Sequence, residues 1–336
     1  MTIQKLAEEC GVSASTVSRA LNGDPNVNET VRERIMAAAV NSGYCKSDRR
    51  HKKKKSGKRY IAVIACTARN YFYSEILGRI EDCLRNTDYS TGFLRLDNGE
   101  DEIEKAVSLM QEDRLAGIIF LGGRFDYTPS EIAVINVPFV MCAYTNRFGS
   151  LPPKLFSSVY CDDYMIGYNT AKTLIDAGHK KIGAIFTSKN DRSASELHYQ
   201  GFCAALSDSG IELEDKYIVE TKNNSIETGC AGANTLLNRG LDMTAVFADS
   251  DAMAFGALKA IDDRGFRVPE DISVIGIDGL TFSKYLIPTL MTTVRPAQEL
   301  AEISVKLLVE LIEGGENRQI CLPSYLRRGE SVKKLI

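Results

Sequence analysis

Short apolar runs alternate with segments of helical periodicity along most of this chain, from residue 60 onward. This alternation predicts parallel sheets whose faces are covered by helices, so the expected fold class is α/β. The length of the two consecutive series favours two lobes over the alternative, a single large doubly wound domain. The predicted strands are Tyr60–Ala65, Gly117–Leu121, Pro138–Cys142, Ile182–Phe186, Tyr217–Glu220, Ala245–Ala248 and Ile272–Ile277. The predicted helices are Ser74–Arg85, Met165–Ala177, Ala194–Ser207, Glu227–Arg239, Asp251–Arg264 and Ala297–Ile312.

The first 45 residues instead predict a small all-α domain of three short helices. Thr2 is placed to cap the first helix, and Gly11 follows its end, where a left-handed backbone is least costly. Ser13 caps a second helix from Ala14 to about Asn22, and Asn28 caps a third. Two helices joined by a short glycine-containing turn form the helix-turn-helix pattern. The alternative is a small solvated helical bundle without a ligand.

The second of these helices carries small and polar side chains on one stripe, as a helix must if it enters the major groove of DNA. Ala14 and Ser15 lie at the amino end of this helix, where side chains reach deepest into the major groove. Arg19 is long enough to contact a guanine or a phosphate. Hydroxyl and amide groups nearby are expected to donate to phosphates, which fixes register rather than sequence. These residues are Thr2, Ser13, Thr16, Ser18 and Asn22.

Charge is divided unevenly between the two regions. Residues 1–59 contain 13 Lys/Arg and 6 Asp/Glu, whereas residues 60–336 contain 28 and 38. A basic module ahead of an acidic body indicates a polyanionic partner for the module. Residues 46–59, which include Lys52 and Lys53, have no apolar side chain to bury. This composition predicts a basic linker that faces DNA. The alternative is a solvated tether.

Several segments near the amino terminus together form a known motif: Thr2–Ala7, Gly11–Ser13, Ser15–Gly23, Val27, Thr30–Ile35 and Gly43–Tyr44. They resemble the DNA-binding headpiece of the lactose-repressor (LacI/GalR) family. The resemblance implies a dimeric repressor with a sensor like a periplasmic binding protein. It also implies that Ala14 and Ser15 read bases with Arg19, and it adds Thr30 and Tyr44 to the expected DNA contacts.

The linker departs from that family's pattern. Where the family has a Pro, an Arg and a Leu wedge that opens the minor groove, this chain has Lys46, His51 and Lys53. We hypothesise that the linker stays disordered or orders on DNA as a cationic strand that binds by counterion release. The alternative is a weakened operator preference with little DNA bending.

The resemblance continues through Gly178–Ile182, Gly201–Phe202, Asp251–Ala257 and Val268–Gly276. It implies that the chain passes between two lobes three times and that an effector binds in the cleft between them, at the carboxyl ends of the strands. The expected domains are a headpiece (1–45), a linker (46–59), a first lobe (60–160 plus 292–320) and a second lobe (161–291 plus 321–336).

The cleft candidates are aromatic and polar residues near strand ends. Aromatic faces can stack on a sugar ring, and carboxylates can accept hydroxyl hydrogen bonds. Asp251 has the alternative role of a helix cap, and Asp278 that of a turn residue. The family's effector-gripping Arg is His198 here, and Arg192 could replace it. The predicted effector-binding residues are Tyr71, Phe72, Tyr73, Tyr144, Asn146, Arg192, His198, Ser250, Asp251 and Asp278.

An enzyme is not expected. The carboxylate pairs at Asp249–Asp251 and Asp162–Asp163 have no histidine partner or phosphate-binding glycine loop, so we expect no cofactor and no metal. The nine scattered cysteines, without a CxxC, favour a reducing cytoplasm, and no apolar run suits a signal or a membrane span.

The sequence therefore predicts a cytoplasmic homodimeric repressor that binds a pseudo-palindromic DNA operator under the control of a small molecule, expected to be a sugar. The absence of a heptad tail favours a dimer over a tetramer. The alternatives are a weakly specific DNA-binding protein with a vestigial sensor and an unsecreted solute-binding module.

Overall fold

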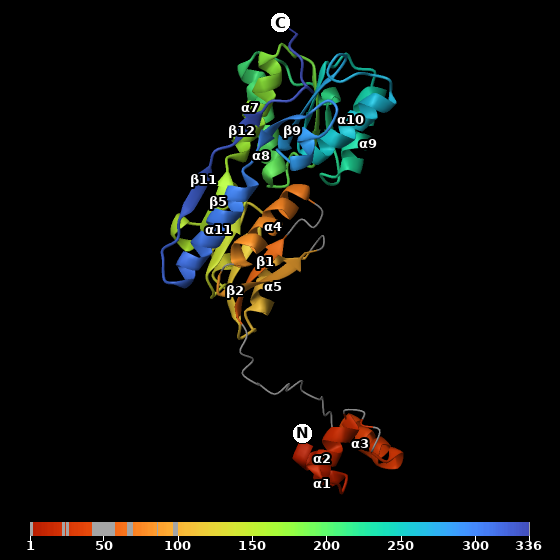
Figure 1. Ribbon diagram of the computed structural model, residues 1–336, viewed down its shortest axis with the longest axis vertical. Helices are drawn as coiled ribbons and strands as arrows, with labels where there is room; N and C mark the ends of the chain where they lie inside the picture. Colours follow the sequence, from red (N-terminus) through yellow and green to blue (C-terminus); the bar gives the residue numbers. More distant parts are fainter. Residues whose placement is uncertain are drawn as a thin grey trace. The chain divides into compact units, whose positions relative to one another are not determined.

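The computed structural model describes residues 3–21, 24, 27–41, 58–65, 70–85, 87–96 and 100–335. The chain forms two compact units, residues 1–57 and residues 58–336 (Figure 1), and each is described by itself. The prediction of a small helical domain followed by an α/β body is confirmed. Within the described residues, no helix is both long and apolar enough to cross a membrane.

The small unit contains α1 (Ile3–Glu9), α2 (Ala14–Leu21) and α3 (Glu29–Asn41). Gly11 has a φ of 60° after α1, as its predicted position requires. The backbone N–H of Thr16 donates to Ser13 Oγ at 3.2 Å, and that of Thr30 donates to Asn28 Oδ1 at 3.0 Å, so both predicted caps are present. The helices enclose a core of Ala7, Cys10, Val17, Ala20, Val27 and Ile35.

The larger unit begins with a parallel sheet in the order β11-β5-β4-β3-β1-β2. Buried apolar side chains place α4 and α11 on one face and α5 and α6 on the other, and we call this layered body the first lobe. Its strands are β1 (Arg59–Ala65), β2 (Tyr89–Arg95), β3 (Leu115–Leu121), β4 (Phe139–Cys142), β5 (Ser157–Cys161) and β11 (Gln319–Leu322). Its helices are α4 (Tyr71–Arg85), α5 (Glu102–Leu109), α6 (Pro129–Ile132) and α11 (Ala297–Ile312).

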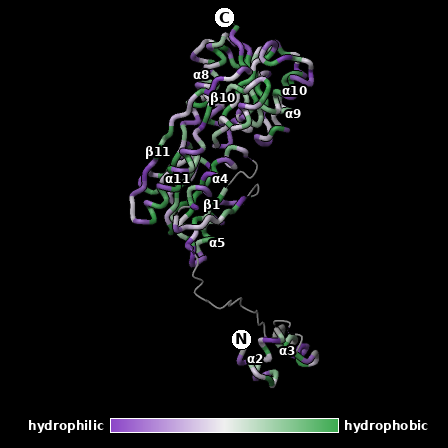
Figure 2. Tube along the Cα trace, in the orientation of Figure 1, coloured by the Kyte–Doolittle hydropathy of each residue, from purple (hydrophilic) through white to green (hydrophobic). Residues whose placement is uncertain are grey.

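The second lobe has a sheet in the order β12-β10-β9-β8-β6-β7, parallel except for β12. Helices α7 and α8 cover one face, and α9 and α10 cover the other. Its strands are β6 (Ile182–Phe186), β7 (Ile218–Glu220), β8 (Ala245–Ala248), β9 (Ser273–Asp278), β10 (Met291–Val294) and β12 (Tyr325–Arg327). Its helices are α7 (Asp163–Asp176), α8 (Ala194–Asp208), α9 (Ile226–Asn238) and α10 (Asp251–Asp263). Along the helices of both lobes, hydrophobic and hydrophilic residues alternate (Figure 2).

The chain passes between the lobes after β5, after β10 and after β11. Two predicted boundaries must therefore move by a few residues. Residues 292–294 belong to the second lobe because β10 pairs with β9, and residues 321–322 belong to the first lobe because β11 pairs with β5. Each passage lies beside a strand's carboxyl end, which is where the polar groups described next are gathered.

Candidate functional site

The exposed face of α2 is the first candidate site. Val17 and Ala20 are buried, which turns Ser15 and Arg19 outward into solvent, while Ala14, Thr16 and Ser18 are half-buried. Ser13, also exposed, lies 2.8 Å from the hydroxyls of both Ser15 and Thr16. Arg19 is the only charged residue in α2, so the face combines short hydroxyl side chains with a single guanidinium.

Thr30 is exposed at the start of α3. Five other predicted DNA contacts lie outside the described residues, together with the linker on which the hypothesis of a cationic strand depends. These five are Thr2, Asn22, Tyr44, Lys52 and Lys53.

The second candidate site is a buried group of charged side chains in the second lobe, at the carboxyl ends of its strands. Asp249 follows β8, Asp278 ends β9 and Arg295 follows β10, while Asp163 begins α7 and His198 lies on α8. Each of the five is at most 7% exposed. We call these five residues the buried charged cluster.

Contacts within the cluster pair each cation with carboxylates. His198 Nδ1 lies 2.7 Å from Asp249 Oδ1, and His198 Nε2 lies 3.4 Å from Asp163 Oδ1. The Arg295 guanidinium lies 3.4 Å from Asp163 and 3.4 Å from Asp278. Ser195 donates to the second oxygen of Asp249, so this carboxylate is held from two sides.

These contacts set the protonation states. Burial lowers the pKa of His198, but the adjacent carboxylates of Asp163 and Asp249 outweigh it and raise the pKa to about 9. Burial likewise opposes ionisation of Asp163, yet Arg295 and His198 bring its pKa below the ordinary value. Burial raises the pKa of Asp278 to about 7 despite Arg295. Near neutral pH, His198 is therefore an imidazolium between carboxylates.

Two glycines bring α7 and α8 close enough for this pairing. A Cβ on Gly167 would overlap the backbone of His198, and a Cβ on Gly201 would overlap the carbonyl of Tyr164. Only glycine permits such close backbone approach. Asp278 has a φ of 111°, a strained value for a residue with a side chain, which is a common feature of binding sites.

The first lobe contributes an aromatic face. The Arg295 guanidinium lies over the ring of Phe72, 4.2 Å from its centroid, and Phe72 is fully buried. Of its predicted neighbours, Tyr73 is half-buried and Tyr71 is exposed. Phe72 therefore contacts the cluster through Arg295.

Other direct contacts join the lobes at the edge of the cluster. Arg192 Nη1 lies 3.0 Å from Asp126 Oδ2, and the Arg192 carbonyl accepts from Phe125 N–H at 3.2 Å. The backbone N–H of Thr281 donates to Glu75 Oε1 at 3.2 Å. The predicted residue Arg192 thus bridges the lobes rather than touching the cluster.

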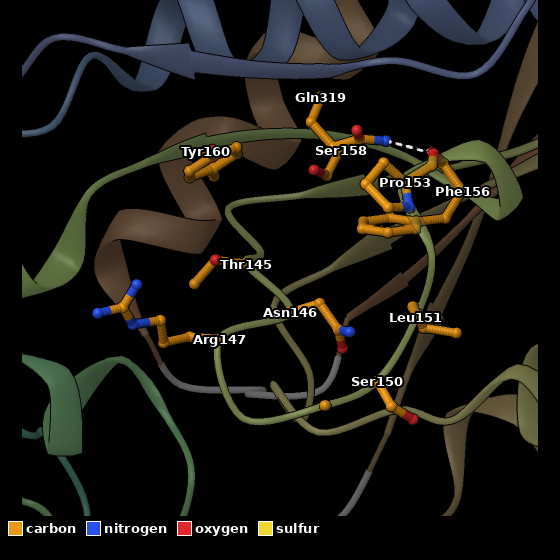
Figure 3. A pocket seen from close by; sticks show the side chains of 11 residues that line it. Thr145, Asn146, Arg147, Ser150, Leu151, Pro153, Phe156, Ser158, Tyr160 and Gln319 are labelled. Carbon is orange, nitrogen blue, oxygen red and sulfur yellow. Dashed lines mark hydrogen bonds between the residues drawn. The ribbon is translucent and has the colours of Figure 1, made fainter.

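Two predicted residues lie elsewhere in the first lobe. Tyr144 is fully buried, with ring contacts to Phe125, Tyr127 and Phe156, and its hydroxyl lies 2.6 Å from the Asn146 amide. Asn146 lines a surface hollow of about 500 Å³ beside β5 (Figure 3). Within the described part of the chain, neither residue makes a hydrogen bond or ring contact with the buried charged cluster.

Ser250 and Asp251 lie at the start of α10. The alternative that Asp251 is the helix cap is wrong, because Ser250 Oγ is the cap and accepts from Met253 N–H at 3.2 Å. Asp251 is buried, and its Oδ2 accepts from Leu280 N–H at 2.7 Å, next to Asp278. Burial and the Asp278 charge raise the pKa of Asp251 well above its ordinary value.

Sequence reasoning did not name Asp163, Asp249 and Arg295 as binding residues. The two aspartates were considered only as parts of carboxylate pairs without a histidine, but both are within reach of His198. The sequence does carry a signal for Arg295, because this single charged residue directly follows the uncharged run Met291–Val294. Its partners come from distant parts of the chain, so only the fold reveals them.

Comparison with known proteins agrees with this architecture. Residues 2–47 match the family model of bacterial regulatory proteins, lacI family, and residues 171–332 match that of a periplasmic binding protein-like domain. The transcriptional regulator MalR of Clostridium butyricum is 33% identical, covering 98% of this chain and 99% of its own. The ribose operon repressor of Haemophilus influenzae is 28% identical, covering 93% of this chain and 92% of its own. The solved transcriptional regulator CelR–cellobiose complex has 26% identity and a TM-score of 0.70, covering 98% and 99%.

The helix-turn-helix unit and the two-lobed body define a DNA-binding transcriptional regulator with a periplasmic-binding-protein-like domain. With MalR at 33% identity over nearly the full length, the chain belongs to the lacI family of bacterial regulatory proteins. The predicted family, fold class and regulatory function are confirmed. The named relatives are transcriptional regulators, in agreement with the prediction that the chain is not an enzyme.

Proposed function

We propose that this protein is a cytoplasmic repressor whose headpiece reads one half of a pseudo-palindromic operator. The observation that carries the proposal is the exposed face of α2, with Ser15 and Arg19 turned outward beside half-buried Ala14. Arg19 has the length and donor geometry to contact a guanine, and the hydroxyls have the reach of phosphates. Ser13, Thr16, Ser18 and Thr30, with Thr2, Asn22, Tyr44, Lys52 and Lys53, are the proposed supporting DNA contacts.

The proposed effector is a sugar, bound between the lobes at the buried charged cluster. His198 and Asp278 offer a donor and an acceptor there, and Phe72 offers an aromatic face from the other lobe. The CelR complex with cellobiose gives a precedent in a similar fold. The other predicted effector-binding residues complete the proposed site: Tyr71, Tyr73, Tyr144, Asn146, Arg192, Ser250 and Asp251.

Dimerisation is proposed through the second lobe. Three apolar side chains near the end of β9 are strongly exposed: Phe282 at 63%, Tyr285 at 79% and Ile287 at 100%. Tyr325 and Leu326 on β12 are also exposed, and Arg327 ties β12 to this segment by donating to Leu280 O. An exposed apolar patch fits a self-complementary interface, and a twofold dimer matches a palindromic site.

The test is selection of DNA from a random pool by the full-length protein. We expect enrichment of an inverted repeat, and we expect Arg19→Ala to abolish or change the enriched sequence. A matched control, Arg85→Ala on the exposed surface of α4, should enrich the same repeat as the wild type. Binding without an enriched sequence, with an affinity that falls steeply with salt, would instead support the weakly specific alternative.

A further inference from the structure

The surface hollow beside β5 has one wall on the sheet of the first lobe (Figure 3). Ser158 of β5 is paired in register with Gln319 of β11. Because side chains alternate between the faces of a strand, Ser158, Tyr160 and Gln319 share one face of the sheet. Gln319 Nε2 donates to the carbonyls of Pro153 and Phe156 at 2.8 and 2.6 Å. These bonds fix the wall before any ligand binds.

The loop that follows β4 faces this wall across the hollow and is held together by Asn146 (Figure 3). The Asn146 amide lies 2.6 Å from the Tyr144 hydroxyl. When the amide nitrogen donates to this hydroxyl, the amide oxygen accepts from the N–H groups of Ser150 and Leu151 at 3.3 and 2.7 Å. The loop passes so close to Asn146 that a Cβ on Gly149 would overlap its side chain. The hollow of about 500 Å³ is therefore preformed and has the size of a small-molecule site.

Hydroxyl groups line the hollow without a side-chain hydrogen bond to any residue that the structure describes. They belong to Thr145, Ser158 and Tyr160. Ser158 is the most informative of them, because it is only 1% exposed and its side chain points into the hollow (Figure 3). A buried hydroxyl is rarely left without a partner, so this one calls for a ligand.

The charge of the lining favours an anion. Among the described residues that line the hollow, Arg147 alone is charged, and it forms no ion pair with a described carboxylate. Asp162 lies outside the lining, and its Oδ1 accepts from Met165 N–H at 3.1 Å as the cap of α7. Burial, followed by Cys321 and Asp162, raises the pKa of Tyr160, which therefore remains a hydroxyl donor at neutral pH. The hollow thus offers donors and a guanidinium without a lining carboxylate.

We propose that this hollow binds the phosphate group of a small phosphate ester, with Arg147 and the three free hydroxyls as donors. A phosphate dianion has three terminal oxygens that accept hydrogen bonds, and it pairs well with a guanidinium. The organic part of the ester then lies against Leu151 and Phe156. All of the lining residues belong to the first lobe, so this site is separate from the buried charged cluster.

The first experiment is calorimetry of the full-length protein at constant ionic strength with glycerol 3-phosphate, glycerate and glycerol. These three probes share a three-carbon skeleton and differ in the group to be recognised. We expect saturable binding of glycerol 3-phosphate, at least about tenfold weaker binding of glycerate, and none of glycerol. Glycerate that binds as tightly as the phosphate ester, or no binding of the ester, would overturn the proposal.

The second experiment repeats the titration of glycerol 3-phosphate with variants of the lining. Arg147→Gln should weaken binding at least about tenfold. Ser158→Ala removes a hydroxyl that has no partner in the protein, so it should weaken binding without lowering the melting temperature, which a structural role would not explain. Wild-type affinity in either variant would contradict the assignment.

Lys154→Gln is the matched control, because Lys154 is exposed close to the hollow but does not line it. This variant should keep the wild-type affinity within about twofold. Equal weakening by Lys154→Gln and Arg147→Gln would mean that the anion is attracted only by the general surface charge, and the proposal would fail.

Discussion

The two lobes share one architecture, yet they contribute different chemistry to the buried charged cluster. The second lobe supplies every charged member, from α7, α8 and the ends of β8, β9 and β10. The first lobe supplies Phe72, and its polar contacts with the second lobe, such as that of Asp126, lie at the edge. In the proposed effector site, the charged groups therefore come from the second lobe and the aromatic ring from the first.

A buried carboxylate in each lobe gives the sharpest test of this comparison. Asp163 is ionised between two cations, whereas burial raises the pKa of Glu102 in the first lobe, where Tyr127 donates to it. Asp163→Asn should lower the free energy of unfolding at neutral pH by about 3–5 kcal/mol, because it leaves two buried cations short of a partner. Glu102→Gln should cost less than about 1 kcal/mol, because burial disfavours the charged form of Glu102 and a Gln amide oxygen can still accept from Tyr127. Urea unfolding of both variants measures the two values. Equal losses of unfolding free energy would show that the two buried carboxylates do not differ in the way proposed.

Histidines occur in the second lobe and not in residues 60–160, so pH should affect the lobes differently. The folded-state pKa of His198, about 9, lies above its ordinary value of 6.5. The stabilisation of the folded state by protonated His198 is therefore fully present below about pH 6.5 and is lost as the pH rises through about 9. The difference in unfolding free energy between wild type and His198→Gln should shrink by about 3 kcal/mol over that interval.

The control is His179→Gln, because burial lowers the pKa of His179. His179 is then neutral in both states above about pH 7, so its difference from wild type should stay constant there. A pH dependence shared by both variants would show that the charged cluster is not its source.

Glycine packing distinguishes the helices of the two lobes. Gly201 on α8 has no room for a Cβ beside Tyr164, whereas Gly78 on α4 has nothing within 4 Å of that position. Gly201→Ala should therefore destabilise the protein by about 1–3 kcal/mol, and Gly78→Ala should stabilise it by about 0.5–1 kcal/mol. Chemical unfolding compares them directly, and destabilisation by both would contradict the account of the α7–α8 contact.

The smallest effect is expected at the edge of the cluster. Arg192 is 62% exposed where it pairs with Asp126, so water screens the interaction. Arg192→Ala should change the free energy of unfolding by less than about 1 kcal/mol. A larger loss of unfolding free energy would mean that contacts between the lobes stabilise the folded protein more than the charged cluster does.

Sequence patterns predicted the buried elements best. The bounds of β6, β8 and α11 match the prediction, because fully buried strands and strongly amphipathic helices carry their own signal. Strand β2 was missed because it is a half-exposed edge strand, and β5 because it opens with two serines that are buried only in the folded sheet. Such strands depend on neighbours that are remote in sequence.

The candidate site was predictable only in part for the same reason. His198 is predicted from the family resemblance and Asp278 from its position after a strand, and the structure places both in the cluster. The contact of Asp163 with His198 arises from α7 packing on α8 through Gly167 and Gly201, and no local pattern reports that packing. The position of Tyr144 after a strand also does not reveal that its ring is fully buried against Phe125.

A sugar bound at the buried charged cluster is proposed to control how tightly the headpiece holds DNA. Fluorescence anisotropy of the full-length protein on its selected inverted repeat tests this, with and without a saturating concentration of a sugar found to bind by a rise in the protein's melting temperature. We predict a change in Kd of about 5- to 150-fold, the usual range of coupling between two sites. An unchanged Kd under saturating sugar would contradict the account.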